Sequence, residues 1–296
     1  MPDTGALAIV AGLLCWTGPV SPEPLGGGLS NTNYTVRDRG RRFVVRIGTD
    51  MPMHGVMRFN ELNASRAAYR AGLGPEVVHW QAGVLVIAYV EGRTLTADEA
   101  RAPAMVPRVA DIIRRCHRDV TQHISGPVLM FWPFHLARHY ASLLRAGGSR
   151  HASDMPNLLD AAERLERAVG PIAPVFGHND LLAANFIDDG RRLWLIDWEH
   201  SGFSSPLFDL ANFASNNELA PDAETALLDA YLGAAPDRDF RRRYAAMTCA
   251  SLLREAMWGM TSEIHSPIEH DFARYADDYL ARFEWAWSRF RDEWSA

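Results

Sequence analysis

The chain of 296 residues contains no lysine, since all 30 of its basic residues are arginine. Any chemistry that commonly uses a lysine amine must here use arginine or do without it. Cysteine is scarce as well: Cys15, Cys116 and Cys249 are far apart and are not spaced like metal ligands. Few, scattered cysteines are typical of a reducing compartment, so we expect a cytoplasmic protein.

The chain also lacks a hydrophobic run long enough to span a membrane. Its apolar N-terminal stretch, GALAIVAGLLCW, has about 12 residues, whereas a membrane span needs about 20. Asp3 is acidic and no small-residue cleavage site is evident, so we interpret this stretch as a buried first helix rather than a signal peptide. Because the net charge is −6, we expect neither nucleic acid nor a membrane as a partner.

The sequence divides into two regions that differ in their predicted secondary structure. Alternating β-branched and aromatic residues in NYTV, FVVRI and VLVIAYV predict strands in residues 1–91, around one helix that Gly74-Pro75 ends. We therefore predict an α+β chain with two lobes, a small β-rich lobe of residues 1–91 and a larger, mainly helical lobe of residues 92–296, joined by a hinge near Tyr89–Gly92. In the second lobe we expect helices over 98–118, 134–147, 155–169, 222–232, 238–265 and 270–294, and strands around 175–177, 186–187 and 193–196.

A cluster of polar residues interrupts the apolar pattern of the second lobe. The stretch GHNDLLAANF carries Asp180 and Asn185, and IDWEH follows with Asp197. Asp189-Gly190 lies between two apolar runs and predicts a hairpin that places Asn185 roughly opposite Asp197. An amide oxygen and a carboxylate at that separation can share Mg²⁺, which prefers oxygen ligands. Asp180, five residues before Asn185, would then lie close enough to act as a base, as in kinases.

The motifs HNDLLAAN, LIDWEHSG and PLFDLANFASNN resemble those of the choline/ethanolamine kinases and the aminoglycoside phosphotransferase superfamily, and the similarity covers roughly residues 20–290. The resemblance implies a protein-kinase-like fold with ATP and Mg²⁺ as cofactors. It implies that Asp180 is the catalytic base and that Asn185 and Asp197 bind the metal.

The same resemblance assigns roles to three further residues. Glu199 occupies the acidic position of an IDxE pattern near the metal, and the sequence leaves open whether it binds the ion directly. His178 would support the catalytic loop. Asp209, in FDLAN, would accept hydrogen bonds that stiffen this loop.

The first lobe carries the residues that a nucleotide would need. Arg46, in FVVRIG, stands where protein kinases use a lysine on the phosphates, and Glu61 on the following helix is its expected partner. Tyr89 and Glu91 lie in the predicted hinge, where backbone groups would meet adenine. A glycine-rich element similar to the family's GGxxN would cover the phosphates, with these residues: Gly27, Gly28, Ser30, Asn31 and Asn33.

The C-terminal helices carry the expected acceptor site. AMWGM and DFARYA resemble the choline kinase segments that form an aromatic box, so Trp258 and Tyr275 are expected to meet a quaternary ammonium group. An acidic residue such as Glu263 or Asp271 would supply a negative charge. Phe272 departs from the tyrosine that is common there, which leaves the aromatic face intact. We therefore expect a small alcohol substrate with a cationic amine, most simply choline or ethanolamine.

Three alternatives stay open at this point. The acceptor could be an aminoglycoside or thiamine, within the same chemistry. In a different class, the chain could be a catalytically silent kinase-like binding module. The sequence also leaves open whether the protein is a monomer or a homodimer.

Overall fold

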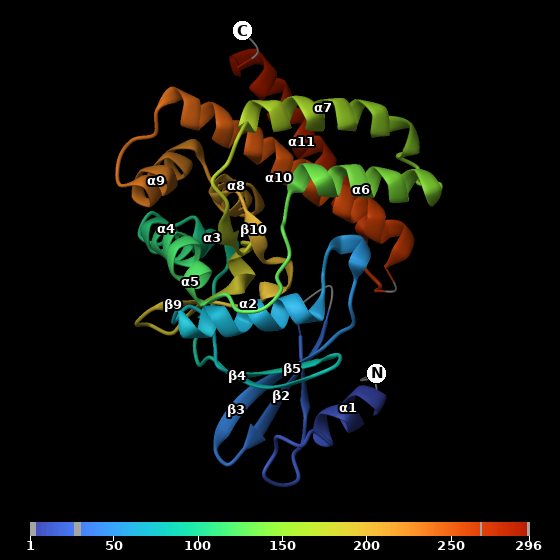
Figure 1. Cartoon of the computed structure of the whole chain (residues 1–296), viewed down its shortest axis with the longest axis vertical. Coiled ribbons are helices and arrows are strands. Elements are labelled where there is room, and N and C mark those ends of the chain that lie inside the picture. Colours follow the sequence, from blue (N-terminus) through green and yellow to red (C-terminus); the bar gives the residue numbers. More distant parts are fainter. Residues whose placement is uncertain (1–3, 27–30, 267, 295–296) are drawn as a thin grey trace.

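The structure is a computed structural model, and it describes residues 4–26, 31–266 and 268–294. An antiparallel sheet occupies one end of the molecule, and a larger body of helices occupies the other (Figure 1). The predicted α+β fold of a small β-rich lobe and a larger helical lobe is confirmed. Among the described helices, none has the length and apolar character needed to cross a membrane.

The small lobe is a five-stranded sheet with the order β1-β2-β3-β5-β4. Its strands alternate, so that Tyr34, Val45 and Val86 lie on one buried face with α1 (Thr4–Ala11) packed against them. The other face is turned toward α2 (Arg58–Arg70) and carries Arg46. The strands are β1 (Glu23–Leu25), β2 (Thr32–Asp38), β3 (Arg41–Ile47), β4 (Val77–Gln81) and β5 (Val84–Ala88).

The prediction of a buried first helix is wrong for most of this stretch. Among the α1 side chains that the structure describes, those of Ala6 and Val10 are buried, while Ile9 is 48% exposed, and Leu14 just beyond the helix is 94% exposed. A helix that lies on the outer face of a thin sheet can bury only one of its sides. The stretch therefore has more apolar side chains than the sheet can bury.

The chain changes its partners between β5 and β6 (Arg93–Thr94). β5 belongs to the five-stranded sheet, whereas β6 pairs with β8 (Phe186–Asp188) of the large lobe, which pairs with β9 (Leu193–Leu195). The segment between β5 and β6 therefore joins the lobes. It lies where the sequence places the hinge.

The predicted hairpin at Asp189-Gly190 is confirmed, but its register differs by one residue from the prediction. Phe186 lies opposite Leu195, so Asn185 faces Ile196, whose amide donates to the Asn185 carbonyl at 3.0 Å. Asp197 follows one residue later and adopts a left-handed conformation with φ 67°. This backbone conformation, rather than direct pairing, determines the direction of the Asp197 side chain.

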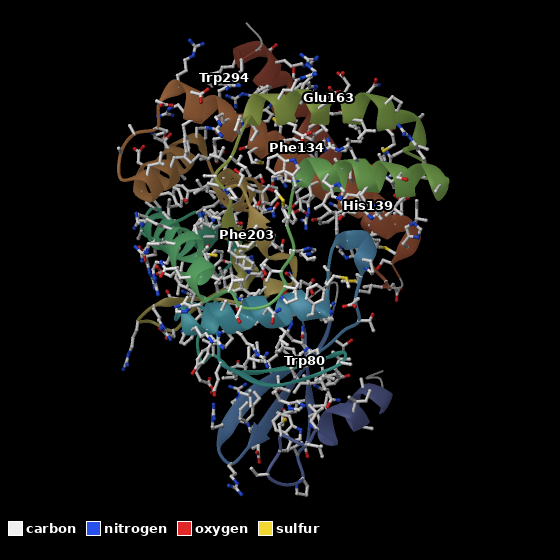
Figure 2. All side chains as sticks on the ribbon, viewed as in Figure 1. Trp80, Phe134, His139, Glu163, Phe203 and Trp294 are labelled. Atoms are coloured by element: carbon white, nitrogen blue, oxygen red, sulfur yellow. The ribbon has the colours of Figure 1, made fainter. Side chains whose placement is uncertain are left out.

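The large lobe is built around α10 (Arg238–His265), which contacts α6, α7, α8 and α11. Side chains fill the space among these helices, with Phe134 inside the helical body and Trp294 near its far end (Figure 2). The other α-helices are α3 (Ala97–Ala100), α4 (Val106–Arg115), α5 (Thr121–His123), α6 (Pro133–Ala146), α7 (Met155–Val169), α8 (Pro206–Asn216), α9 (Pro221–Leu232) and α11 (Phe272–Trp294).

The single helix predicted over 98–118 is wrong, because the structure divides it. α3 ends at Ala100, and α4 begins at Val106, with Pro103 in the turn between them and Pro107 in the first turn of α4. A proline inside a helix removes a hydrogen bond and clashes with the preceding turn, so the chain starts a new helix instead. The short strands β7 (Val175–Gly177) and β10 (Gly202–Ser204) pair with each other, and β10 was not predicted.

Candidate active site

A cleft of about 940 Å³ lies between the lobes. The sheet of the small lobe contributes Arg46 and Ile87 to its lining, and the large lobe contributes Asp180, Asp197 and Trp258. Its volume is at the upper end of the usual range for small-molecule sites, so it has room for a nucleotide and a small second substrate.

The catalytic loop after β7 is held by the carboxylate of Asp209 at the start of α8. Asp209 accepts hydrogen bonds from the backbone amides of His178 at 2.9 Å and Asn179 at 2.7 Å. His117 Nε2 donates to the same carboxylate at 2.9 Å. Burial would raise the pKa of Asp209, but these hydrogen bonds, that from His117 above all, leave its pKa below the usual range. The ionised carboxylate therefore fixes the backbone immediately before Asp180, in the role that the sequence analysis gives it.

His178 links the catalytic loop to the segment that carries Asp197. Its Nε2 donates to the carbonyl of Ile196 at 2.9 Å, and its Nδ1 accepts from the backbone amide of Asp180 at 3.3 Å. Burial lowers the pKa of His178, so the ring is neutral and this pair of contacts sets its tautomer. His178 is a positioning residue, because its contacts hold the two neighbouring segments together.

Two buried asparagines complete the support of the loop, and the sequence analysis missed them. Asn212 Oδ1 accepts from the amide of Leu181 at 2.6 Å, and Asn217 Oδ1 accepts from the amide of Ala183 at 2.8 Å. Both belong to the motif FDLANFASNN, in which only Asp209 received a role. Polar side chains in an apolar helix were the available signal, since such groups are buried only with partners.

Asp180 and Asn185 meet directly. Asn185 Nδ2 donates to the Asp180 carbonyl at 2.8 Å and to its Oδ2 at 3.3 Å. Because Nδ2 is the donor, Oδ1 is the atom of Asn185 that can approach a cation. Burial raises the pKa of Asp180 to about 8; Arg254 opposes this shift, while Glu255 and Asp197 add to it. With such a pKa the group is mostly protonated near pH 7 when no cation is bound, and a positive charge in the cleft would lower the pKa toward the range that suits a general base.

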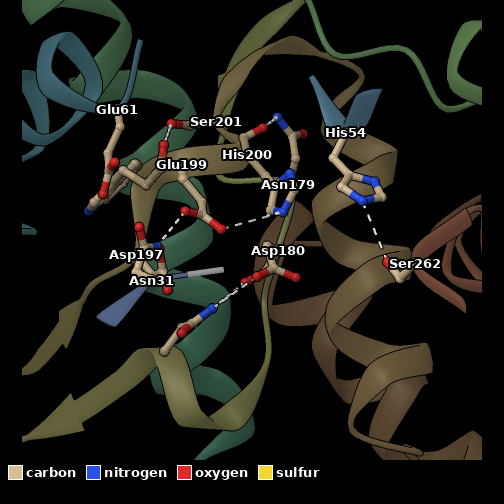
Figure 3. A network of polar contacts seen from close by, with 12 residues as sticks. Asn31, His54, Glu61, Asn179, Asp180, Asp197, Glu199, His200, Ser201 and Ser262 are labelled. Atoms are coloured by element: carbon tan, nitrogen blue, oxygen red, sulfur yellow. Dashed lines mark hydrogen bonds and ion pairs between the residues drawn. The ribbon is translucent and has the colours of Figure 1, made fainter. Parts of the chain in front are cut away.

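Three carboxylates and two guanidinium groups form a network at the opposite wall of the cleft, and its members that line the cleft are Arg46, Asp197 and Glu199. Oxygens of Glu61, Asp197 and Glu199 all lie within 4.8 Å of one another, and Figure 3 shows these side chains together, with Asp180 facing them. Arg46 Nε donates to Glu61 at 2.8 Å, and its Nη2 donates to Asp197 at 2.5 Å. Arg58 Nη1 donates to Glu61 at 2.6 Å and to Glu199 at 3.0 Å. The predicted Arg46–Glu61 contact is therefore present, within a larger network.

This wall has the composition of a site for a hard cation. Its donors are all oxygens, and three carboxylates against two arginines leave one negative charge in excess. Burial raises the pKa of Asp197 to about 6, with the charge of Arg46 acting against the shift and that of Glu199 with it. A divalent cation would relieve this repulsion. Asn185, Asp197 and Glu199 all line the cleft, so the residues fit the predicted metal site.

Asn31, Asn33 and Tyr89, which were predicted to contact a nucleotide, line the cleft. Asn31 Nδ2 donates to Glu199 at 2.7 Å, and Asn33 lines the cleft. Tyr89 also lines it; its amide donates to the Arg42 carbonyl of β3 at 3.0 Å, so this amide is already engaged with the sheet. Of the other predicted residues, Gly27, Gly28 and Ser30 lie outside the described residues.

The side chains of Glu91 and Glu263, among the described residues, do not line the cleft. Glu91 forms an ion pair with Arg42 at 3.0 Å, and its side chain is 73% exposed. Glu263 forms an ion pair with Arg150 at 3.2 Å on the surface. For Glu263, the sequence pattern predicts which face of α10 the residue occupies, but it does not predict which end of that helix lies beside the cleft.

The far end of the cleft is aromatic, and both predicted aromatic residues are there. The ring of Trp258 lies 5.4 Å from that of Tyr275, 5.7 Å from Phe272 and 5.6 Å from His54. Gly259 allows Tyr275 to lie this close to α10, because a Cβ at position 259 would be 2.8 Å from the Tyr275 ring. Burial lowers the pKa of His54 to about 4, so this ring adds no charge.

Glu255 is the carboxylate at this end, and the sequence analysis did not identify it. It is 3% exposed, lines the cleft and accepts a hydrogen bond from the Tyr275 hydroxyl at 3.0 Å. It lies about one helical turn before Trp258 on α10, so both side chains are on the same face of the helix. Glu255, and not Glu263, is therefore the carboxylate that lines this end of the cleft, where it also forms an ion pair with Arg254 at 2.5 Å.

The comparisons with known proteins agree with this geometry. The model of the phosphotransferase enzyme family matches residues 21–245. Among curated proteins, the chain is 27% identical over 258 residues to protein LicA of Haemophilus influenzae, covering 84% of this chain and 75% of that protein. It is 28% identical over 271 residues to ethanolamine kinase 2 of Mus musculus, covering 82% and 69% of the two chains. The crystal structure of a choline/ethanolamine kinase family protein from Mesorhizobium loti superposes with a TM-score of 0.77 and 27% identity, covering 97% of this chain and 96% of that one.

Proposed function

The chain belongs to the phosphotransferase enzyme family and is a small-molecule kinase, and on that premise we propose that it transfers the γ-phosphoryl group of ATP to the hydroxyl of a small amino alcohol, choline or ethanolamine. The observation that carries the proposal is the position of Asp180. It lies between the carboxylate–arginine wall, which suits phosphates and a cation, and the aromatic end with Glu255, which suits an ammonium group.

The nucleotide would bind along the sheet side of the cleft. Val44, Ile87 and Ile187 line the part of the cleft beside the hinge and offer apolar surface to a base. Arg46 would then contact the phosphates through Nη2 while Glu61 keeps its Nε in place. Asn185, Asp197 and Glu199 would hold Mg²⁺, whose charge offsets that of the phosphates.

The transfer needs one base and good alignment. Asp180 accepts the proton of the acceptor hydroxyl, the hydroxyl oxygen forms a bond to the γ-phosphorus, and the bond from that phosphorus to the β–γ bridging oxygen breaks, leaving ADP. Asp209, Asn212 and His178 hold the backbone around Asp180, so the base is in place before the substrates arrive.

The aromatic end favours a compact ammonium over a polycation. Trp258 and Tyr275 present aromatic faces to a single positive charge, and Glu255 is the carboxylate beside them. Several ammonium groups, as in an aminoglycoside, would need several such carboxylates. Glu263, the other carboxylate considered, is occupied by Arg150 outside the cleft.

A panel assay tests the proposal. ADP release would be measured with Mg²⁺·ATP and, in turn, choline, ethanolamine, thiamine and kanamycin, using wild-type protein and Asp180→Asn. We expect turnover with choline or ethanolamine that the variant lacks, while the variant still binds ATP in a calorimetric titration. Turnover only with kanamycin or thiamine would overturn the amino alcohol as substrate, and undiminished turnover by the variant would overturn the role of Asp180.

A further inference from the structure

Arg254 is a cation at the end of the cleft that we assign to a cationic substrate. Two arginines line the described cleft: Arg46 at the nucleotide end and Arg254 near the acceptor end. Arg254 lies on α10, next to Glu255, and only 2% of its surface is exposed. A buried guanidinium and an ammonium group repel each other. An arginine in this position is therefore expected to have a further, anionic partner.

The hydrogen bonds of Arg254 are incomplete. Its Nη1 donates to Glu255 at 2.5 Å, and its guanidinium lies 5.7 Å from the centre of the Phe131 ring. Within the part of the chain that the structure describes, Nε and Nη2 have no hydrogen-bond acceptor, although both are buried. Buried donors of a charged group are costly to leave unpaired, so they indicate a missing acceptor.

The charges around Arg254 indicate what this acceptor is. Glu255 already balances one part of the guanidinium, and the nearby His54 is neutral because burial lowers its pKa. Arg254 is also the positive charge that most opposes the shift in the pKa of Asp180, which places it on the base's side of the cleft. These charges favour an anion as the missing acceptor, and the phosphoryl group is the anion that transfer to the acceptor hydroxyl would bring to this end of the cleft.

We propose that Arg254 binds the non-bridging oxygens of the transferred phosphoryl group, and so holds the phosphomonoester product at the acceptor end. This inference rests on the proposed function. Arg46 would contact the phosphoryl group from the nucleotide side before transfer, and Arg254 would contact it from the acceptor side after transfer. The negative charge on the phosphoryl oxygens would thus be balanced by a guanidinium at both stages. The bonds that form and break are those of the transfer itself, and Arg254 only donates hydrogen bonds.

The same chemistry could serve a carboxylate on the acceptor, and the experiment separates the two sources. Dissociation constants would be measured by calorimetry, without nucleotide, for ethanolamine, phosphoethanolamine and serine. The proteins are wild type, Arg254→Met and the double variant R254M/E255Q, which removes both charges of the buried pair and so guards against misfolding of the single variant. Arg243→Met is the matched control, because Arg243 lies on the same helix but donates to the Val169 carbonyl at 2.7 Å, away from the cleft.

The ratio of the ethanolamine to the phosphoethanolamine dissociation constant isolates the contribution of the phosphate. We expect this ratio to fall about 10-fold or more in Arg254→Met and in the double variant, and to stay unchanged in Arg243→Met. An unchanged ratio in both Arg254 variants would overturn the inference, as would a loss of affinity confined to serine. If wild-type protein binds neither ethanolamine nor its phosphate ester, the same ratio is measured with choline and phosphocholine, and a lack of binding to both pairs overturns the proposed function and this inference with it.

Discussion

Replacing Arg46 by lysine tests whether this lysine-free chain needs a guanidinium at its phosphate site. Arg46 uses two different nitrogens at once, since Nε donates to Glu61 at 2.8 Å and Nη2 donates to Asp197 at 2.5 Å. A lysine keeps the charge but presents its donors from one nitrogen on a flexible chain, so it cannot reproduce the geometry in which Arg46 holds Glu61 through Nε and a second group through Nη2. The variant should therefore lose at least one charge-assisted hydrogen bond in the nucleotide complex.

The size of the effect follows from the burial of these groups. The side chains of Arg46 and Glu61 are 10% and 3% exposed, so solvent screens their contact only slightly. A hydrogen bond to a charged group contributes about 1.5–3 kcal/mol. This range corresponds to a kcat/KM for ATP that is about 10- to 150-fold lower in Arg46→Lys than in the wild type.

The assay is ADP release with ATP varied at saturating amino alcohol, alongside thermal unfolding to confirm that the variant is folded. Arg41→Lys is the matched control on the same strand, because the Arg41–Glu76 pair is on the surface, with side chains 59% and 41% exposed. We expect that control to change kcat/KM by less than about twofold, since exposed ion pairs contribute little. A similarly small change in Arg46→Lys would refute the reasoning.

Three further predictions concern the base, the acceptor end and the catalytic loop. Burial raises the pKa of Asp180 from 3.8 to about 8, so the folded protein binds this proton more tightly than the unfolded chain, and its stability falls as pH rises from about 4 to about 8. Asp180→Asn has no carboxyl group to titrate at this position, so the difference between the calorimetric Tm of the variant and that of the wild type should become more favourable to the variant as pH rises from about 4 to about 8. A difference that stays constant with pH would contradict the prediction. Gly259→Ala places a Cβ 2.8 Å from the Tyr275 ring, so steady-state kinetics should show a raised KM for the amino alcohol and an almost unchanged KM for ATP; equal changes in both would count against it. Asp209→Asn weakens the contacts that hold the catalytic loop, and we expect kcat to fall about 10-fold or more while calorimetry shows retained ATP affinity; an unchanged kcat would show that the loop needs no such support.

The hairpin shows how far sequence reasoning reaches at this site. Asp189-Gly190 between apolar runs predicted the turn, and the structure has it. The register differs by one residue, so Ile196 rather than Asp197 faces Asn185. Asp197 lines the cleft nevertheless, because it adopts a left-handed conformation that alternation along a strand does not include.

The acidic residue at the acceptor end shows where sequence reasoning stops. Glu255 and Glu263 are both on α10, about two turns apart, and thus on similar faces of the helix. Only the packing of α11 and of the segment around His54 against α10 decides which end of that face meets the cleft. These contacts join residues more than a hundred positions apart in the case of His54, so no local pattern can contain them.

The absence of lysine has a consequence for how the site handles charge. A lysine presents all its donors from one nitrogen, whereas Arg46 joins Glu61 to Asp197 through two different nitrogens. An oxygen of Asp197 that is held at 2.5 Å by Nη2 cannot offer its full charge to a cation as well. A phosphate that attracts Nη2 would release that oxygen, while the contact between Nε and Glu61 keeps the guanidinium in place. We therefore expect Arg46 to couple the binding of a nucleotide to the exposure of Asp197, with the buried Glu61 keeping Arg46 in place while it changes partners.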